Sequence, residues 1–259
     1  MSISANKLYA GYNKKYIINN QEIDIDEGKI NIFIGPNGSG KSTIFNALCK
    51  QLSYLNGNIF IDDENIDNIC IKKLAAKIGI LFQENTIPSD ITVYDLISYG
   101  RFAHIKIFDK FSDNDKNIIK NAMKLTNIEQ FQNKQVCELS SGQRQLVWIA
   151  MLITQEAKYL FLDEPTTYLD LFNQFEILNC LNILNKNYNK TIIMILHDVN
   201  LALQYADKIF IIKDGKLIIS GSPQKIITSK LLQDTFNVSF DIVKKLNKMY
   251  CIPKKLNNN

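Results

Sequence analysis

Residues 35–42 match the pattern Gly-x-x-x-x-Gly-Lys-Ser/Thr, directly after an apolar run and before a helical pattern. Glycines let the backbone wrap closely around an anion, so that successive N–H groups and the start of the next helix cradle the β- and γ-phosphates of a nucleotide. The strand–loop–helix context argues against a chance glycine-rich turn. The residues assigned to nucleotide binding here are Gly35, Pro36, Asn37, Gly38, Ser39, Gly40, Lys41, Ser42 and Thr43.

Two side chains in this loop have separate expected tasks. We expect Lys41 to reach the β- and γ-phosphate oxygens with its ammonium group, and the Ser42 hydroxyl to bind Mg²⁺.

Two adjacent carboxylates, Asp163 and Glu164, end the apolar run at 159–162. Parallel sheets present ligands at the carboxyl ends of their strands, so this position suits phosphate chemistry. We expect Asp163 to hold Mg²⁺ through water, beside Ser42, and Glu164 to act as the general base that polarises an attacking water. The alternative is that the pair caps the following helix.

Alternating apolar runs and helical patterns predict an α/β fold with a mainly parallel sheet. Strands are expected at 29–34, 58–61, 77–82, 158–162, 191–196, 208–212 and 216–220, and helices at 42–51, 93–99, 115–125, 143–154, 171–185 and 200–206. The strand signal vanishes between about 85 and 155, which predicts an α-helical subdomain inserted into the core.

The composition is that of an ordinary globular protein, with 46% hydrophobic and 22% charged residues among 259. The net charge of +4 is small and its basic residues are scattered, which argues against a nucleic-acid partner. The 5 cysteines are odd in number and contain no CxxC pair, which favours a reducing compartment. The apolar runs are much shorter than the ~20 residues that cross a bilayer, so any membrane part would belong to another chain.

The run Leu139-Ser140-Ser141-Gly142-Gln143 resembles LSGGQ, the signature of the ATP-binding-cassette family. Ser141 stands where the family has its first glycine, which is tolerated if its φ stays negative. Four more positions match in family order: Tyr12 for the adenine-stacking aromatic, Gln83 for the Q-loop, Asp170 for the D-loop and His197 for the switch histidine. Each match alone has an ordinary structural explanation, but together they span nearly the whole chain.

The resemblance implies one nucleotide-binding domain over 1–259, with a P-loop NTPase core at about 1–84 and 156–259, N-terminal antiparallel β elements and a helical subdomain at about 85–155. It implies an ATPase with ATP and Mg²⁺ as cofactors, with Gln83 and His197 joining Glu164 in catalysis and Gln83 also near the metal. It further implies a head-to-tail homodimer around ATP, in which Ser140 and the Gly142 amide contact the γ-phosphate held by the other copy. Gln143 and Asp170 are also assigned to ATP binding.

Several segments are similar to ATPases of iron(III)–siderophore importers, among them 143–151, 165–170, 197–200 and 205–207. This similarity implies integral-membrane permease partners, an indirect periplasmic or lipoprotein binding protein, and a peripheral position on the cytoplasmic face of the membrane. Cobalamin and haem importers remain alternatives, as does a soluble ATPase without a transport role.

The helical segment from about 83 to 104 is predicted to dock a permease helix in a groove lined by some of the apolar side chains in and just after it, with Arg101 or His104 at the polar rim. The alternative is that its apolar side chains all fill the subdomain's own core. These side chains are Ile87, Ile91, Val93, Tyr94, Ile97, Tyr99, Phe102, Ile105 and Phe108.

Overall fold

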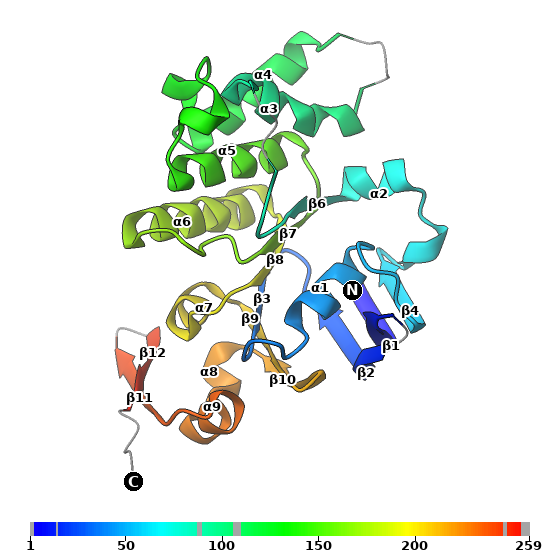
Figure 1. Ribbon diagram of the computed structural model, residues 1–259, viewed down its shortest axis with the longest axis vertical. Coiled ribbons are helices and arrows are strands. Elements are labelled where there is room, and N and C mark those ends of the chain that lie inside the picture. The colour runs from blue at the N-terminus through cyan, green and yellow to red at the C-terminus, as the bar shows by residue number, and fades with distance from the viewer. Residues whose placement is uncertain (1–2, 14, 87–89, 106–109, 246–247, 255–259) are drawn as a thin grey trace. The chain divides into compact units, whose positions relative to one another are not determined.

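A computed structural model describes residues 3–13, 15–86, 90–105, 110–245 and 248–254 (Figure 1). The chain divides into two compact units, one made of 1–68 and 191–259 and the other of 69–190. No helix within the described ranges is long and apolar enough to cross a membrane.

The first unit contains a mainly parallel group of buried strands, as the sequence predicts. Strand β3 (Ile30–Ile34) lies between β8 (Thr191–Ile195) and β9 (Lys208–Lys213) and runs parallel to both, while β10 (Lys216–Gly221) pairs antiparallel with β9. Every residue of β3 and β8 is buried. Continuous burial explains why these strands appear in the sequence as unbroken apolar runs.

A separate antiparallel sheet occupies the N-terminal part of the first unit. It has the order β2-β1-β4-β5 and is formed by β1 (Ile3–Tyr12), β2 (Lys15–Ile25), β4 (Asn56–Ile61) and β5 (Glu64–Asn65). The sequence predicts antiparallel β elements in this part of the chain. Of the strands observed here, however, its apolar pattern indicated only β4. Register shifts along β1 break the alternation on which such a prediction depends.

Short helices and a C-terminal hairpin complete the first unit. They are α1 (Lys41–Leu48), η1 (Ile66–Asn68), α7 (Val199–Tyr205), α8 (Pro223–Ile226), α9 (Ser229–Phe236), β11 (Phe240–Lys245) and β12 (Lys248–Pro253). The Asn200 side chain accepts from the N–H of Cys251 and donates to its carbonyl, which fastens β12 to α7. The hairpin was not predicted, because its burial alternates over only a few residues.

The second unit combines a parallel strand pair with helices. Strands β6 (Ile78–Leu81) and β7 (Tyr159–Asp163) pair in parallel. The helices are α2 (Ile71–Lys77), α3 (Val93–Ser98), η2 (Tyr99–Ala103), α4 (Asp113–Leu125), η3 (Glu129–Phe131), η4 (Val136–Glu138), α5 (Ser141–Thr154) and α6 (Leu171–Tyr188). Figure 1 shows α3 and α4 beside α5. The helix-rich stretch therefore lies where the sequence placed it.

Capping boxes explain why two helices begin earlier than predicted. Ser112 and Asp115 bond reciprocally at the start of α4, and Ser140 and Gln143 do so at the start of α5. A capping box satisfies two backbone N–H groups that the first turn leaves without partners, so the helix starts directly after the serine.

Candidate active site

The predicted phosphate loop connects β3 to α1 in the first unit. Gly38 and Gly40 have φ values of 73° and 99°, a region that glycine enters without steric cost. The Lys41 side chain folds back over the loop, and its Nζ donates to the carbonyls of Gly35 and Pro36, each at 2.9 Å. The ammonium group therefore lies within the loop whose N–H groups are expected to bind phosphate.

Neighbouring strands brace this loop. A Cβ on Gly40 would lie 2.7 Å from Cδ1 of Ile18 on β2, and the φ of 99° would strain any larger residue there. The N–H of Gly215, in the turn between β9 and β10, donates to the carbonyl of Ser39 at 2.9 Å. Tyr12 stands at the end of β1 with 47% of its surface exposed, on the strand paired with β2.

His197 lies at the same edge of the parallel strands as the loop. The N–H of Leu196 donates to the carbonyl of Phe33 at 3.2 Å, so the ends of β8 and β3 are neighbours. The exposed His197 follows β8, and Gly35 follows β3. The structure thus places the predicted switch histidine and the start of the phosphate loop at adjacent strand ends of one unit.

In the second unit, Gln83 and Glu164 are in direct contact. The Gln83 Nε2 donates to Oε2 of Glu164 at 2.8 Å, and the Thr167 hydroxyl donates to the same oxygen at 3.1 Å. Glu164 itself has a φ of 50°, which is uncommon for a residue other than glycine and recurs at functional sites. The predicted base is therefore held between two donors. Thr167 was not predicted. Its position three residues after Glu164, across a turn, could have indicated that its hydroxyl reaches the carboxylate.

Asp163 is buried at the end of β7 and does not cap a helix. The cap of α6 is Asp170, whose Oδ1 accepts from the N–H of Asn173 at 2.8 Å. The alternative interpretation of the two carboxylates as a helix cap is thus wrong.

The signature residues form the first turn of α5. The Ser140 hydroxyl accepts from the Gln143 N–H at 3.3 Å, and the Gln143 Oε1 accepts from the Ser140 N–H at 3.0 Å. Ser141 is helical, so replacing the family's glycine costs no left-handed conformation. Gly142 is buried, and a Cβ added there would lie 2.4 Å from Cγ of Asn173. Sequence reasoning missed Asn173, because nothing in the local pattern connects it to residue 142.

The family model of the ABC transporter matches residues 18–167, which include the phosphate loop, the signature turn and both carboxylates. The chain belongs to the ABC transporter family.

Curated relatives resemble the cassette over nearly its whole length. The iron(3+)-hydroxamate import ATP-binding protein FhuC of Bacillus subtilis (strain 168) is 38% identical, over 100% of this chain and 97% of the relative. The ferric enterobactin transport ATP-binding protein FepC of Escherichia coli (strain K12) is 36% identical, over 92% and 88%.

A solved structure agrees with this fold assignment. A metal-chelate type ABC transporter in an inward-facing conformation superposes with a TM-score of 0.85 at 27% identity, covering 98% of this chain and 97% of the other. The resemblance to the cassette family and the α/β fold class are both confirmed.

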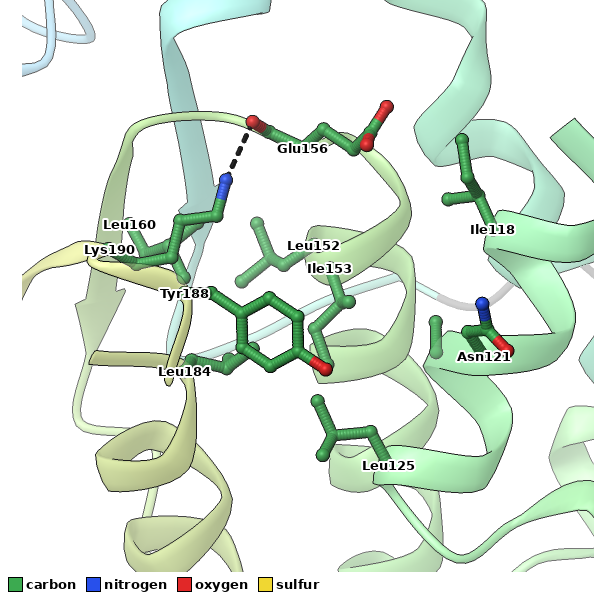
Figure 2. A pocket seen from close by; sticks show the side chains of 11 residues that line it. Ile118, Asn121, Leu125, Leu152, Ile153, Glu156, Leu160, Leu184, Tyr188 and Lys190 are labelled. Carbon is green, nitrogen blue, oxygen red and sulfur yellow. Dashed lines mark hydrogen bonds between the residues drawn. The ribbon is translucent and has the colours of Figure 1, made fainter. Parts of the chain in front are cut away.

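One cavity of the cassette lies apart from the predicted site residues. It has a volume of about 220 Å³ and is lined by α4, α5, β7 and α6 within the second unit (Figure 2). Its lining is mainly aliphatic, and Lys190 donates from Nζ to the carbonyls of Glu156 and Ala157, each at 2.8 Å. None of the residues assigned to nucleotide chemistry lines it. We attribute it to incomplete packing among the helices.

A second hollow, of about 480 Å³, is the surface that we call the aromatic groove. Its lining is Lys72, Ala75, Tyr99, Gly100, Phe102, Ala103, Ile105, Met151 and Gln155. Tyr99 and Phe102 are 43% and 53% exposed and stack with ring centroids 5.0 Å apart. Because these two rings face solvent, the alternative in which the whole apolar segment fills the core is wrong.

Only some of the apolar side chains of that segment line the groove, as predicted, but the expected polar rim differs. Ile91, Val93 and Ile97 are buried, and Ile87 and Phe108 lie outside the described residues. Arg101, expected at a polar rim, is instead 4% exposed. It bonds from Nε to Asp115 at 2.8 Å, because a guanidinium so deeply buried needs a carboxylate partner.

Proposed function

We propose that this cassette is the ATP-hydrolysing subunit of an importer of iron(III)–siderophore complexes. The observation that carries the hydrolytic part is the Glu164 carboxylate, which directly follows β7 and accepts from Gln83 at 2.8 Å. A carboxylate so positioned can take a proton from water. The cargo is supported by the relatives, whose names refer to iron(3+)-hydroxamate and ferric enterobactin.

In this proposal the phosphate loop binds ATP through the N–H groups of segment 35–43, to which every residue except Pro36 can contribute, and Lys41 turns its ammonium group toward the β- and γ-phosphates. Tyr12 stacks on the adenine ring. Tyr12 is half exposed at the end of β1.

The catalytic proposal assigns Glu164 as the base, with Gln83 and His197 orienting the attacking water and the γ-phosphate. Ser42, Gln83 and Asp163 offer a hydroxyl, an amide and a carboxylate oxygen, a donor set that suits Mg²⁺. Bound Mg²⁺ neutralises charge on the phosphate oxygens. The Gln83 amide contacts Glu164, so it orients the base and can respond to the nucleotide state.

We further propose that two copies close head to tail around ATP. Ser140, Gly142, Gln143 and Asp170 of one copy then face the nucleotide held by the other. The start of α5 supports this, because a helix N-terminus favours an anion. A solved bacterial ABC transporter cassette, 25% identical with a TM-score of 0.75, is dimeric.

The aromatic groove is proposed to receive a cytoplasmic helix of the permease. An apolar hollow rimmed by polar side chains suits an amphipathic helix. Tyr99→Asp or Phe102→Asp should then abolish co-purification with the permease while ATP binding by the isolated cassette persists. Ile218→Asp, at an exposed apolar position on β10, is the matched control. Normal assembly of the groove variants would place docking elsewhere, and their unfolding would show that the two exposed rings stabilise the fold rather than dock a partner.

We also propose a helical subdomain at about 85–155 and a location at the cytoplasmic face of the membrane. A substrate-binding protein would act with the cassette indirectly. The helix-rich stretch from α3 to α5 supports the first of these.

Uptake of radiolabelled iron–siderophore, cobalamin and haem by cells lacking the chain tests the cargo. Loss of iron–siderophore uptake alone, restored by the wild-type chain and not by Lys41→Ala, is expected. Loss of cobalamin or haem uptake instead would assign the cassette to those importers. Unchanged uptake of all three, with no polytopic membrane protein co-purifying, would favour a soluble role without transport.

A further inference from the structure

Asn173 connects two segments that are distant in sequence but adjacent in the second unit. Its backbone N–H donates to Oδ1 of Asp170 at 2.8 Å, and its side-chain Nδ2 donates to Oδ2 of the same carboxylate at 2.7 Å. Both carboxylate oxygens of Asp170 are therefore held by one residue. Such charge-assisted bonds fix the direction of a side chain more strongly than neutral ones.

The same amide also lies against the signature turn. A Cβ built on Gly142 would lie 2.4 Å from both Cγ and Oδ1 of Asn173, and 2.8 Å from Nδ2. Real Cβ atoms do not approach so closely, so the absence of a side chain at residue 142 is what admits the amide. A movement of the amide away from residue 142 would disturb the hydrogen bond from its Nδ2 to Asp170.

We propose that Asn173 is a positioning residue that locks the D-loop carboxylate of Asp170 to the signature turn at Gly142, so that the two segments are presented to a second copy as one rigid surface. The proposal rests on the ATP-dependent dimer described above. It also explains the glycine: residue 142 is small because it packs against Asn173, in addition to any contact its N–H makes with phosphate.

The expected consequence lies in dimer closure and turnover rather than in nucleotide capture. Asn173→Ala removes the charge-assisted hydrogen bond from Nδ2 and leaves the Asp170 carboxylate held by the backbone N–H of residue 173 alone. We expect about tenfold weaker ATP-driven dimerisation and a similar fall in kcat. ATP binding by the monomer should not change, because the phosphate loop belongs to the other unit. Asn187→Ala, an exposed asparagine on the same helix, is the matched control and should behave as wild type.

A double-mutant cycle with Gly142→Ala tests the contact itself. In the wild-type background the new methyl group must displace the Asn173 amide, whereas in Asn173→Ala it meets a much smaller side chain. The loss caused by Gly142→Ala should therefore be several-fold smaller in the Asn173→Ala background. Dimerisation is measured by sedimentation with saturating ATP in Glu164→Gln cassettes, hydrolysis in cassettes that retain Glu164, and folding by thermal melting.

Each outcome bears on a different statement. Additive losses, or wild-type behaviour of Asn173→Ala, would overturn the positioning role while leaving the dimer intact. A lowered melting temperature with unchanged kcat and dimerisation in the folded fraction would also overturn it, because Asn173 would then be only structural. If the parent Glu164→Gln cassette failed to dimerise with ATP, the failure would belong to the proposed function.

Discussion

Replacing Arg101 by methionine should destabilise the second unit strongly, because Arg101 is the centre of a buried polar network. Its Nε donates to Asp115 at 2.8 Å, and its Nη1 donates to the Thr154 carbonyl at 2.8 Å and to Glu156 at 2.6 Å. These contacts join η2 to α4 and to the end of α5. Methionine keeps much of the aliphatic volume and removes only the charge and the donors.

The magnitude follows from how exposed each partner is. The Glu156 side chain is 50% exposed, so this arm contributes less than about 1 kcal/mol. The Asp115 side chain is 9% exposed, and leaving it without the guanidinium is the main cost. Removing one partner of a buried ion pair costs about 3–5 kcal/mol, and the lost bond to the Thr154 carbonyl is part of the same disruption. We therefore expect about 4 kcal/mol less free energy of unfolding.

Urea denaturation followed by circular dichroism measures this loss, and the melting temperature should fall by about 10 °C. Lys116→Met is the control, because Lys116 pairs with Asp113 on the surface, where the two side chains are 58% and 94% exposed. That variant should leave the urea midpoint and the melting temperature unchanged, because an exposed ion pair contributes little to stability. A cost below about 1 kcal/mol for Arg101→Met would refute the argument that burial gives the network its strength.

Further predictions concern the active site, pH and thiol reactivity. Lys41→Ala should weaken ATP binding about 10- to 100-fold by removing a charge-assisted donor to phosphate, measured by nucleotide titration; unchanged affinity would contradict the assigned loop. Glu164→Gln should lower kcat about 10²- to 10⁴-fold while keeping ATP affinity, and wild-type turnover would exclude it as the base. Hydrogen bonds from Ser112, together with Arg101, lower the pKa of Asp115, so its contribution is present above the carboxyl's unfolded pKa and is lost as pH falls through the lower folded value. Asp115→Asn should flatten that acid limb of the urea midpoint, and an identical limb would contradict the assignment. Burial raises the pKa of Cys180 to about 12, so a thiol reagent at pH 8 should modify the two exposed cysteines and reach Cys180 only after unfolding.

The predictability of each part of the chain depended on the range of the interactions that fix it. The strands β3 and β8 could be predicted because burial on both faces leaves a continuous apolar run in the sequence. The phosphate loop could be predicted because its chemistry needs contiguous residues. Strand β1 could not, since its bulges remove the alternation, and the cap residues moved the starts of α4 and α5.

Contacts between distant residues left no local signal. Gly142 and Asn173 meet only because α5 and α6 belong to the same unit, and Arg101 is buried only because Asp115 and the end of α5 surround it. A sequence pattern registers the residue type at each position but not the partner that makes it necessary. The arginine was therefore assigned to the surface, and the asparagine was overlooked.

One helix joins the two surfaces that the proposed transport cycle must couple. At its C-terminal end, α5 is hydrogen-bonded to α3 and η2, and η2 carries Tyr99 and Phe102 of the aromatic groove. The Thr154 hydroxyl donates to the Ile97 carbonyl at 2.8 Å, and Arg101 donates to the carbonyl of Thr154. At its N-terminal end, α5 begins with the Ser140–Gln143 capping box and Gly142. A helix of 14 residues spans about 21 Å and is stiff along its axis. A permease helix that displaces Tyr99 or Phe102 would therefore move the signature turn as well, and through Asn173 the Asp170 carboxylate.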